Sequence, residues 1–227
     1  MVIYKSTGFP KRVSEHIEIP SIEELLITPF AKDVLIEDYI KNGNEFQKEF
    51  ANKFPLLNTK KYVYVSQTVT LQNPLISPVI NAYAMDREWH VDGDNSLERD
   101  DIVFHLFANK TSSMTDFNAA EFEIEVENGD DLIRKINTDE EVIKLLKPQQ
   151  IEPNKFYTFD NADIHRAHRC TNFEFRFFTR IIETDVDLGQ GGYGLSVVFD
   201  GSREAILNIH QKFKNGYVDE LNFFMKK

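Results

Sequence analysis

Short runs of β-branched and aromatic residues, separated by turn signals, fill the chain from Lys61 onward and constrain its fold more than any other feature. Such runs favour pleated, half-buried strands, and phenylalanine alone supplies 19 residues. The predicted strands are YVYVSQTVTL, VINAYAM, DIVFHLFA, AEFEIEVE, KFYTFDNADIH, FEFRFFTRII and the short LSVVF. Strands at this spacing predict a β-sandwich or barrel.

Helical patterns flank this β region and interrupt it once. Ser21 and Glu24 form a capping-box pattern that predicts a short helix. Apolar residues recur at helical spacing over about 31–53, over an insert at about 131–146, and over a C-terminal helix at about 202–214. The sequence GQGGYG at 189–194 is expected to be a loop. We therefore predict the α+β class, mainly β.

The length of 227 residues suits one domain. We expect a single domain over 1–227, in which a β core at 61–200 carries the insert. Residues 1–58 would form a helical N-terminal flank, and residues 202–227 would form a C-terminal helical flank.

The net charge and the cysteine content limit which binding partners and which cellular compartment we expect. The net charge is -11, which disfavours binding to nucleic acid or to anionic membranes, although a locally basic groove would restore the former. Cys170 is a lone cysteine that cannot form an intramolecular disulfide, and no apolar run approaches the roughly 20 residues that span a bilayer. We expect a cytoplasmic protein that acts on a small molecule or a protein.

The segment EWHVDGD holds a candidate metal-binding triplet. In an extended chain His90 and Asp92 point to the same side, and Gly93 allows a sharp turn after them. A second histidine from a distant strand would complete a set of two imidazoles and one carboxylate, which is typical of non-haem Fe(II) oxygenases. The triplet alone is weak evidence, because similar residues are common in ordinary turns.

Two histidines in DIHRAHRC are candidates for the distal ligand. His165 ends the predicted strand and is preferred, whereas His168 is expected in the following loop. His105 lies within another predicted strand, between two apolar residues. There a histidine with a hydrogen-bonding partner in the core is a better interpretation than a ligand.

Arg176 and Arg180 share one face of the predicted strand FEFRFFTRII. A guanidinium group is costly to bury without an anion, and it binds carboxylates by a planar two-pronged contact. Arginines beside a metal site therefore suggest a carboxylate ligand. The alternative is that both face solvent or pair with Glu174, Glu183 or Asp185.

These motifs together resemble the Fe(II)/2-oxoglutarate-dependent dioxygenase superfamily. The matching pieces are HVD at 90–92, HRA at 165–167 and R-x-x-x-R at 176–180, and the resemblance covers about Tyr62 to Glu183. It implies a jelly-roll core, also called a double-stranded β-helix.

The resemblance also implies roles for the residues. His90, Asp92 and His165 would bind Fe(II), and Arg176 would bind the far carboxylate of the co-substrate 2-oxoglutarate. The arginine spacing is most similar to the taurine and clavaminate branch, where a second arginine, here Arg180, can hold the substrate.

Three further residues are candidates on the strand before the triplet or next to it. Asn81 and Tyr83 match positions that family members often use for the near end of 2-oxoglutarate, but they could be ordinary sheet residues. Trp89 could line a substrate pocket, although a lone tryptophan is more often part of the core or its rim.

The resemblance implies a hydroxylase that releases succinate and carbon dioxide. One alternative is a cupin-like isomerase or hydrolase with the same metal ligands, which would not bind 2-oxoglutarate. Another is a non-catalytic jelly-roll interaction protein, which would lack stoichiometric metal.

Overall fold

The fold is described from a computed structural model of the chain. The described residues are 1–26, 28–72, 89–92, 97, 101–168, 171–172, 174–189, 191–194 and 197–199. Several predictions lie outside them: the strand VINAYAM, Asn81, Tyr83, Gly93, Cys170 and the helix at 202–214.

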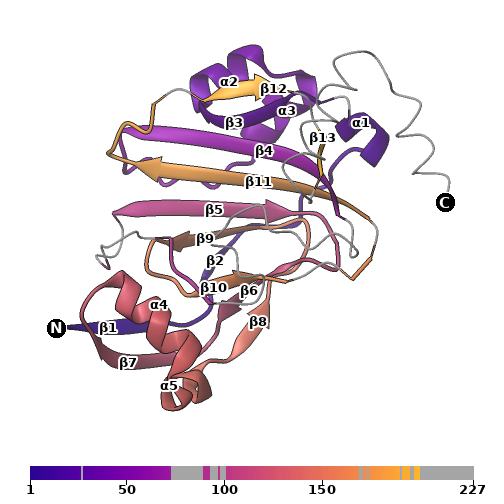
Figure 1. The fold of residues 1–227 in the computed structure, drawn as a ribbon. Coiled ribbons are helices and arrows are strands. Elements are labelled where there is room, and N and C mark those ends of the chain that lie inside the picture. Colours follow the sequence, from indigo (N-terminus) through magenta and orange to yellow (C-terminus); the bar gives the residue numbers. More distant parts are fainter. Residues whose placement is uncertain are drawn as a thin grey trace.

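A large sheet forms the centre of the molecule (Figure 1). Its strands follow the order β12-β3-β4-β11-β5-β9-β2, and β13 adds to β4 in parallel. The long strand β11 pairs antiparallel with both β4 and β5. The bounds are β2 Arg12–Val13, β3 Phe30–Leu35, β4 Tyr62–Gln72, β5 Ile102–Ala108, β9 Phe156–Asp160, β11 Glu174–Thr184, β12 Gly192–Gly194 and β13 Val197–Phe199.

A second, smaller sheet has the order β10-β6-β8. Its strands are β6 Thr115–Asn118, β8 Pro148–Gln150 and β10 His165–Ala167. His90 extends this sheet through an antiparallel bridge to His165. A separate two-stranded ribbon joins β1 Val2–Thr7 to β7 Glu121–Val126.

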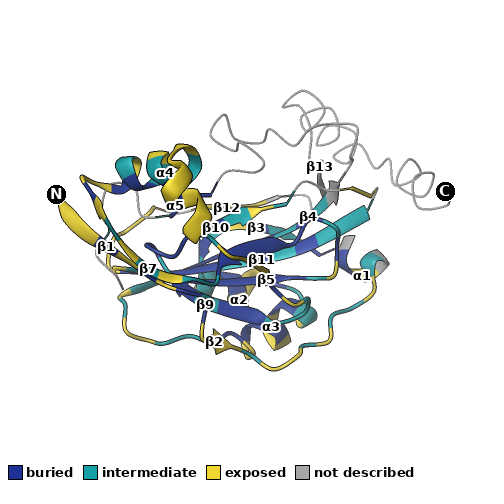
Figure 2. Ribbon diagram, turned by 90° about the horizontal axis from the view of Figure 1, so that it is seen from below, coloured by how far each residue is buried: buried dark blue, intermediate teal, exposed yellow. Residues whose placement is uncertain are grey.

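Strand β11 separates two apolar clusters because its side chains alternate between the two faces of the sheet. Phe177 and Ile181 pack in the cluster that includes Tyr39 of the helical layer. Phe178 and Ile182 pack on the other face, in the cluster that includes residues of β6. In Figure 2 strand β5 is largely buried, and buried and intermediate residues mix along β4 and β11. The helices on the first face are α1 Ile22–Leu26, α2 Ile36–Asn42 and α3 Glu45–Ala51.

The helical insert is confirmed and consists of α4 Gly129–Thr138 and α5 Glu140–Leu145. The side chain of Asn128 caps α4, and that of Asp139 caps α5. Leu132 and Ile136 are fully buried and share a third cluster with Trp89. The insert therefore packs against the segment that carries the candidate metal-binding triplet.

The N-terminal flank is not all helical, so the prediction for 1–58 was partly wrong. It contains β1, β2 and β3, and the predicted helix at 31–53 begins only at Ile36. Residues 30–35 instead pair with β4, with a bulge at Asp33, whose φ is 49°. Hydrogen bonding to β4 satisfies this backbone and overrides the helical spacing of its apolar residues.

The C-terminal glycine segment also differs from the prediction. Gly192–Gly194 form β12, which pairs with β3, although the whole segment was expected to be a loop. The mixed, mainly β class is confirmed. No helix among the described residues is long and apolar enough to cross a membrane.

Candidate metal centre

His90, Asp92 and His165 converge at one point. One ligand atom from each lies within 4.8 Å of the others, and His165 Nε2 is 3.5 Å from Asp92 Oδ2. The backbone enforces this proximity, because the N–H of each histidine donates to the carbonyl of the other at 2.9 Å. This group could hold a metal ion.

The ring of His165 is oriented by a hydrogen bond at Nδ1, which leaves Nε2 facing Asp92. Its Nδ1 lies 2.9 Å from the carbonyl oxygen of Asp163. A carbonyl only accepts hydrogen bonds, so Nδ1 donates this one, and a metal would bind at Nε2. The side chain is 8% exposed, and its ring centroid lies 5.4 Å from that of Phe117 and 5.2 Å from that of Phe159.

The turn between β9 and β10 is held by hydrogen bonds that involve side chains. The Asp163 carboxylate accepts from the Asp160 N–H at 3.0 Å and from the Thr7 hydroxyl at 3.1 Å. The Tyr4 hydroxyl donates to the Ala162 carbonyl at 2.7 Å. Strand β1 therefore anchors the turn that orients the ligand on β10, a role that local sequence patterns did not signal.

Trp89 lies on the opposite side of its segment from the ligands. It is 7% exposed and shares a cluster with Val91, while the Arg166 guanidinium carbon lies 4.3 Å from its ring centroid. Arg166 also donates to the buried Asp116 carboxylate. This placement favours the core role over contact with a substrate.

His168 has a different partner from His165. Its Nε2 lies 2.6 Å from Asp116 Oδ2, and the side chain of Asp116 is only 4% exposed. The structure thus brings His165, and not His168, together with His90 and Asp92.

Arg176 and Arg180 share the face of β11 that carries Phe178, toward the second sheet. The Arg176 guanidinium carbon lies 4.5 Å from the Phe178 ring centroid. An Arg180 nitrogen lies 3.6 Å from Asp33 Oδ1, which also accepts from the Ser66 hydroxyl at 2.6 Å. Asp33 was not among the carboxylates considered as partners for these arginines.

His105 is a core residue with partners, as expected. Its Nε2 lies 2.7 Å from Glu183 Oε1, and both side chains are fully buried. Burial opposes ionisation of Glu183, but hydrogen bonds from His105 and from the N–H groups of Leu57 and Asn58 outweigh it. The pKa of Glu183 therefore lies below its usual value.

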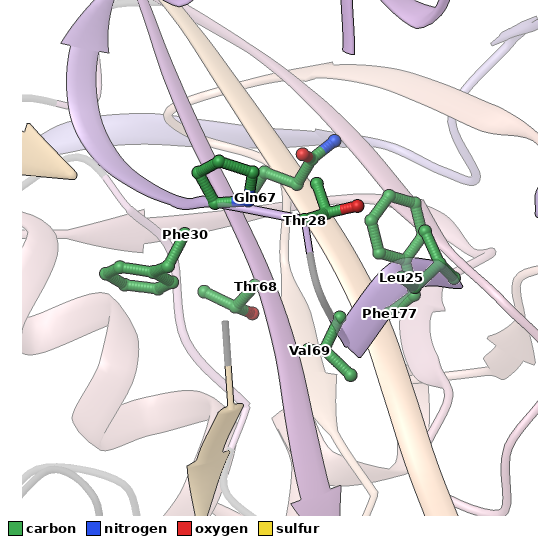
Figure 3. Close-up of a pocket in the computed structure, with 8 residues that line it drawn as sticks. Leu25, Thr28, Phe30, Gln67, Thr68, Val69 and Phe177 are labelled. Carbon is green, nitrogen blue, oxygen red and sulfur yellow. The ribbon is translucent and has the colours of Figure 1, made fainter. Parts of the chain in front are cut away.

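A small recess lies elsewhere, between β4 and the segment before β3 (Figure 3). It is shallow and open to solvent, and it is lined mainly by apolar side chains with Thr28, Gln67 and Thr68. None of the three candidate metal ligands contributes to its lining. The recess is therefore separate from the candidate metal centre.

Comparisons with known proteins add little. No family model and no curated protein matches the chain. A crystal structure of AviO1 from Streptomyces viridochromogenes Tue57 matches with 12% identity and a TM-score of 0.32. The match covers 59% of this chain and 53% of that chain, so it spans about half the length of the solved structure. A likeness this weak carries no argument about fold or function.

Proposed function

We propose that the chain is a non-haem Fe(II)- and 2-oxoglutarate-dependent dioxygenase, a hydroxylase of a small-molecule or protein substrate. The observation that carries this proposal is the convergence of His90, Asp92 and His165. Two imidazoles and one carboxylate leave coordination positions open for other ligands. We place the enzyme in the cytoplasm because it has a single cysteine.

The strand pairing supports a jelly-roll core within one domain. When a chain folds back on itself in this way, the first strand pairs with the eighth, the second with the seventh, and so on inward. Here β4 pairs with β11, the His90 segment with β10, β5 with β9, and β6 with β8, all antiparallel. This order brings the HVD segment beside the distal histidine.

The residues fit iron in chemistry as well as in position. Imidazole and carboxylate together suit Fe(II), and the hydrogen bond from His165 Nδ1 to the Asp163 carbonyl orients Nε2 toward Asp92. Bound iron would supply the chemistry of oxygen activation, while the protein binds, orients and shields. Phe117 and Phe159, which pack against His165, would limit water on that side.

The arginines divide the remaining tasks in this proposal. Arg176 would bind the far carboxylate of 2-oxoglutarate by a two-pronged contact. Arg180, which is paired with Asp33, would contact the substrate. Asn81 and Tyr83 stay candidates for the near end of 2-oxoglutarate, on residues outside the described part of the chain.

The test is a pair of anaerobic calorimetric titrations. We expect one Mn(II) to bind per chain, and we expect 2-oxoglutarate to bind only after the metal. Metal binding without 2-oxoglutarate binding would contradict the dioxygenase and favour the cupin-like alternative. A chain that binds no stoichiometric metal would instead be a non-catalytic interaction protein.

A further inference from the structure

The side chain of Asn137 makes two hydrogen bonds to one residue of the metal-binding segment. Asn137 is the penultimate residue of α4. Its Oδ1 accepts from the Trp89 N–H at 3.0 Å, and its Nδ2 donates to the Trp89 carbonyl at 2.8 Å. Because an N–H only donates and a carbonyl only accepts, these partners also fix which end of the amide is which.

The same segment is bonded on its other edge to β10. His90 directs its N–H and carbonyl to His165, whereas Trp89 directs both of its groups to Asn137. This alternation is the pattern of a strand between two neighbours. The amide of Asn137 thus takes the place of a neighbouring strand on the edge that faces the insert.

Helix α4 and the rotamer of Asn137 are both held in place by packing and hydrogen bonding. Leu132 and Ile136 are fully buried, and Nδ2 of Asn137 also donates to the Ile133 carbonyl at 2.8 Å, which restricts its rotamer. The side-chain amide of Asn137 therefore couples the position of α4 to the backbone next to His90.

We propose that Asn137 is a positioning residue of the metal centre: it fixes the backbone of Trp89, so that the next residue, His90, presents its ring to the metal. This inference rests on the metal site of the proposed function. It gives the helical insert a role in that site. Groups that orient ligands from outside the coordination shell typically contribute about 10- to 100-fold to metal affinity. We expect the lower end, because Asn137 acts through the backbone.

The test compares Asn137→Ala with a matched control. Alanine favours the helix more than asparagine does, so α4 should persist in the variant. Asn109→Ala is the control, because Asn109 makes the same two-bond contact with another strand. It accepts from the Phe177 N–H at 2.8 Å and donates to the Phe175 carbonyl at 3.1 Å, both on β11.

The measurements are Mn(II) affinity by calorimetry and the visible spectrum of the Co(II)-loaded protein. We expect Asn137→Ala to bind Mn(II) about 10-fold more weakly and to show an altered Co(II) spectrum at saturation. Asn109→Ala should keep both at parent values. Asn137→Gln retains the amide on a longer arm and should recover part of the affinity, and it replaces the alanine variant in this comparison if that variant does not fold.

Three outcomes would overturn the inference. Parent-like affinity and spectrum in Asn137→Ala would show that the contact does not orient His90. Equal losses in Asn137→Ala and Asn109→Ala would show that only general stability had changed. If the unmodified protein binds no metal, the proposed function fails first and the inference falls with it.

Discussion

At the scale of single residues, the two histidines near β10 differ in what their ring nitrogens contact. His165 donates through Nδ1 and directs Nε2 toward Asp92, whereas Nε2 of His168 is occupied by Asp116. We expect His165→Ala to abolish stoichiometric Mn(II) binding and His168→Ala to retain it, as measured by calorimetry. The reverse order would mean that the distal ligand has been misassigned.

Arg176 and Arg180 are expected to affect different ligands. A charge-assisted two-pronged contact contributes about 1.5–3 kcal/mol, so Arg176→Ala should weaken 2-oxoglutarate binding roughly 10- to 150-fold. Arg176→Lys should recover only part of this loss, because a point charge cannot form the fork. The measurement is titration of 2-oxoglutarate into the anaerobic Mn(II) form.

Arg180→Ala is the comparison for that titration. It should keep most of the 2-oxoglutarate affinity and impair substrate binding or turnover. Loss of 2-oxoglutarate affinity in Arg180→Ala alone would exchange the two roles. Unchanged affinity in Arg176→Ala would remove that residue from the site.

The convergence of His90, Asp92 and His165 was predictable at this scale because its signals are local. His90 and Asp92 follow from strand parity, and His165 follows from its place at a strand end. The ion pair between Arg180 and Asp33 was not predictable. It depends on a bulge in β3 that places residues far apart in the sequence side by side.

At the scale of elements, the buried pair of His105 and Glu183 joins β5 to β11 and, through Leu57 and Asn58, to the segment before β4. Glu183→Gln would place amide hydrogens against donors that now face a carboxylate. Since leaving buried donors without an acceptor costs about 1–3 kcal/mol, we expect the free energy of unfolding to fall by about 3 kcal/mol in urea denaturation at neutral pH. Glu123→Gln is the control, because its pair with Lys5 is exposed and should contribute at most about 1 kcal/mol.

The same carboxylate predicts how stability depends on pH. The pKa of Glu183 is lower in the folded state than its ordinary value of 4.5. The ionised Glu183 therefore adds to the free energy of unfolding. This contribution is fully present above pH 4.5 and is lost as the pH falls through the folded pKa. Urea denaturation across this acid range should show a shallower loss in Glu183→Gln than in the parent, and equal slopes would contradict this account.

Elements rich in β-branched and aromatic residues, such as β4, β5 and β11, were predicted from the sequence. Strand β3 was mistaken for helix, because its conformation depends on pairing with β4. The short strands β6 and β8 were not predicted. Strand β6 pairs with both β8 and β10 across long sequence separations, which local propensity cannot reveal.

At the scale of the whole molecule, metal binding should stabilise the fold, because the ligands come from segments far apart in the sequence and meet only when the chain is folded. At a free concentration 100 times its Kd, a ligand adds about 2.7 kcal/mol. For a domain of this size, that corresponds to a rise of roughly 5–10 °C in the melting temperature. Calorimetric melting should show this rise with Mn(II) in the parent and none in His165→Ala. An equal rise in both would place the metal elsewhere.

In the proposed function, Fe(II) and 2-oxoglutarate bind at the same site, and one measurement tests the binding of both. Fe(II) and then 2-oxoglutarate are added anaerobically to the purified protein while the visible spectrum is recorded. The account predicts a weak charge-transfer band that needs both additions and is absent from Asp92→Ala. A parent protein that binds Fe(II) but develops no band with 2-oxoglutarate, or a band that persists in Asp92→Ala, would contradict it.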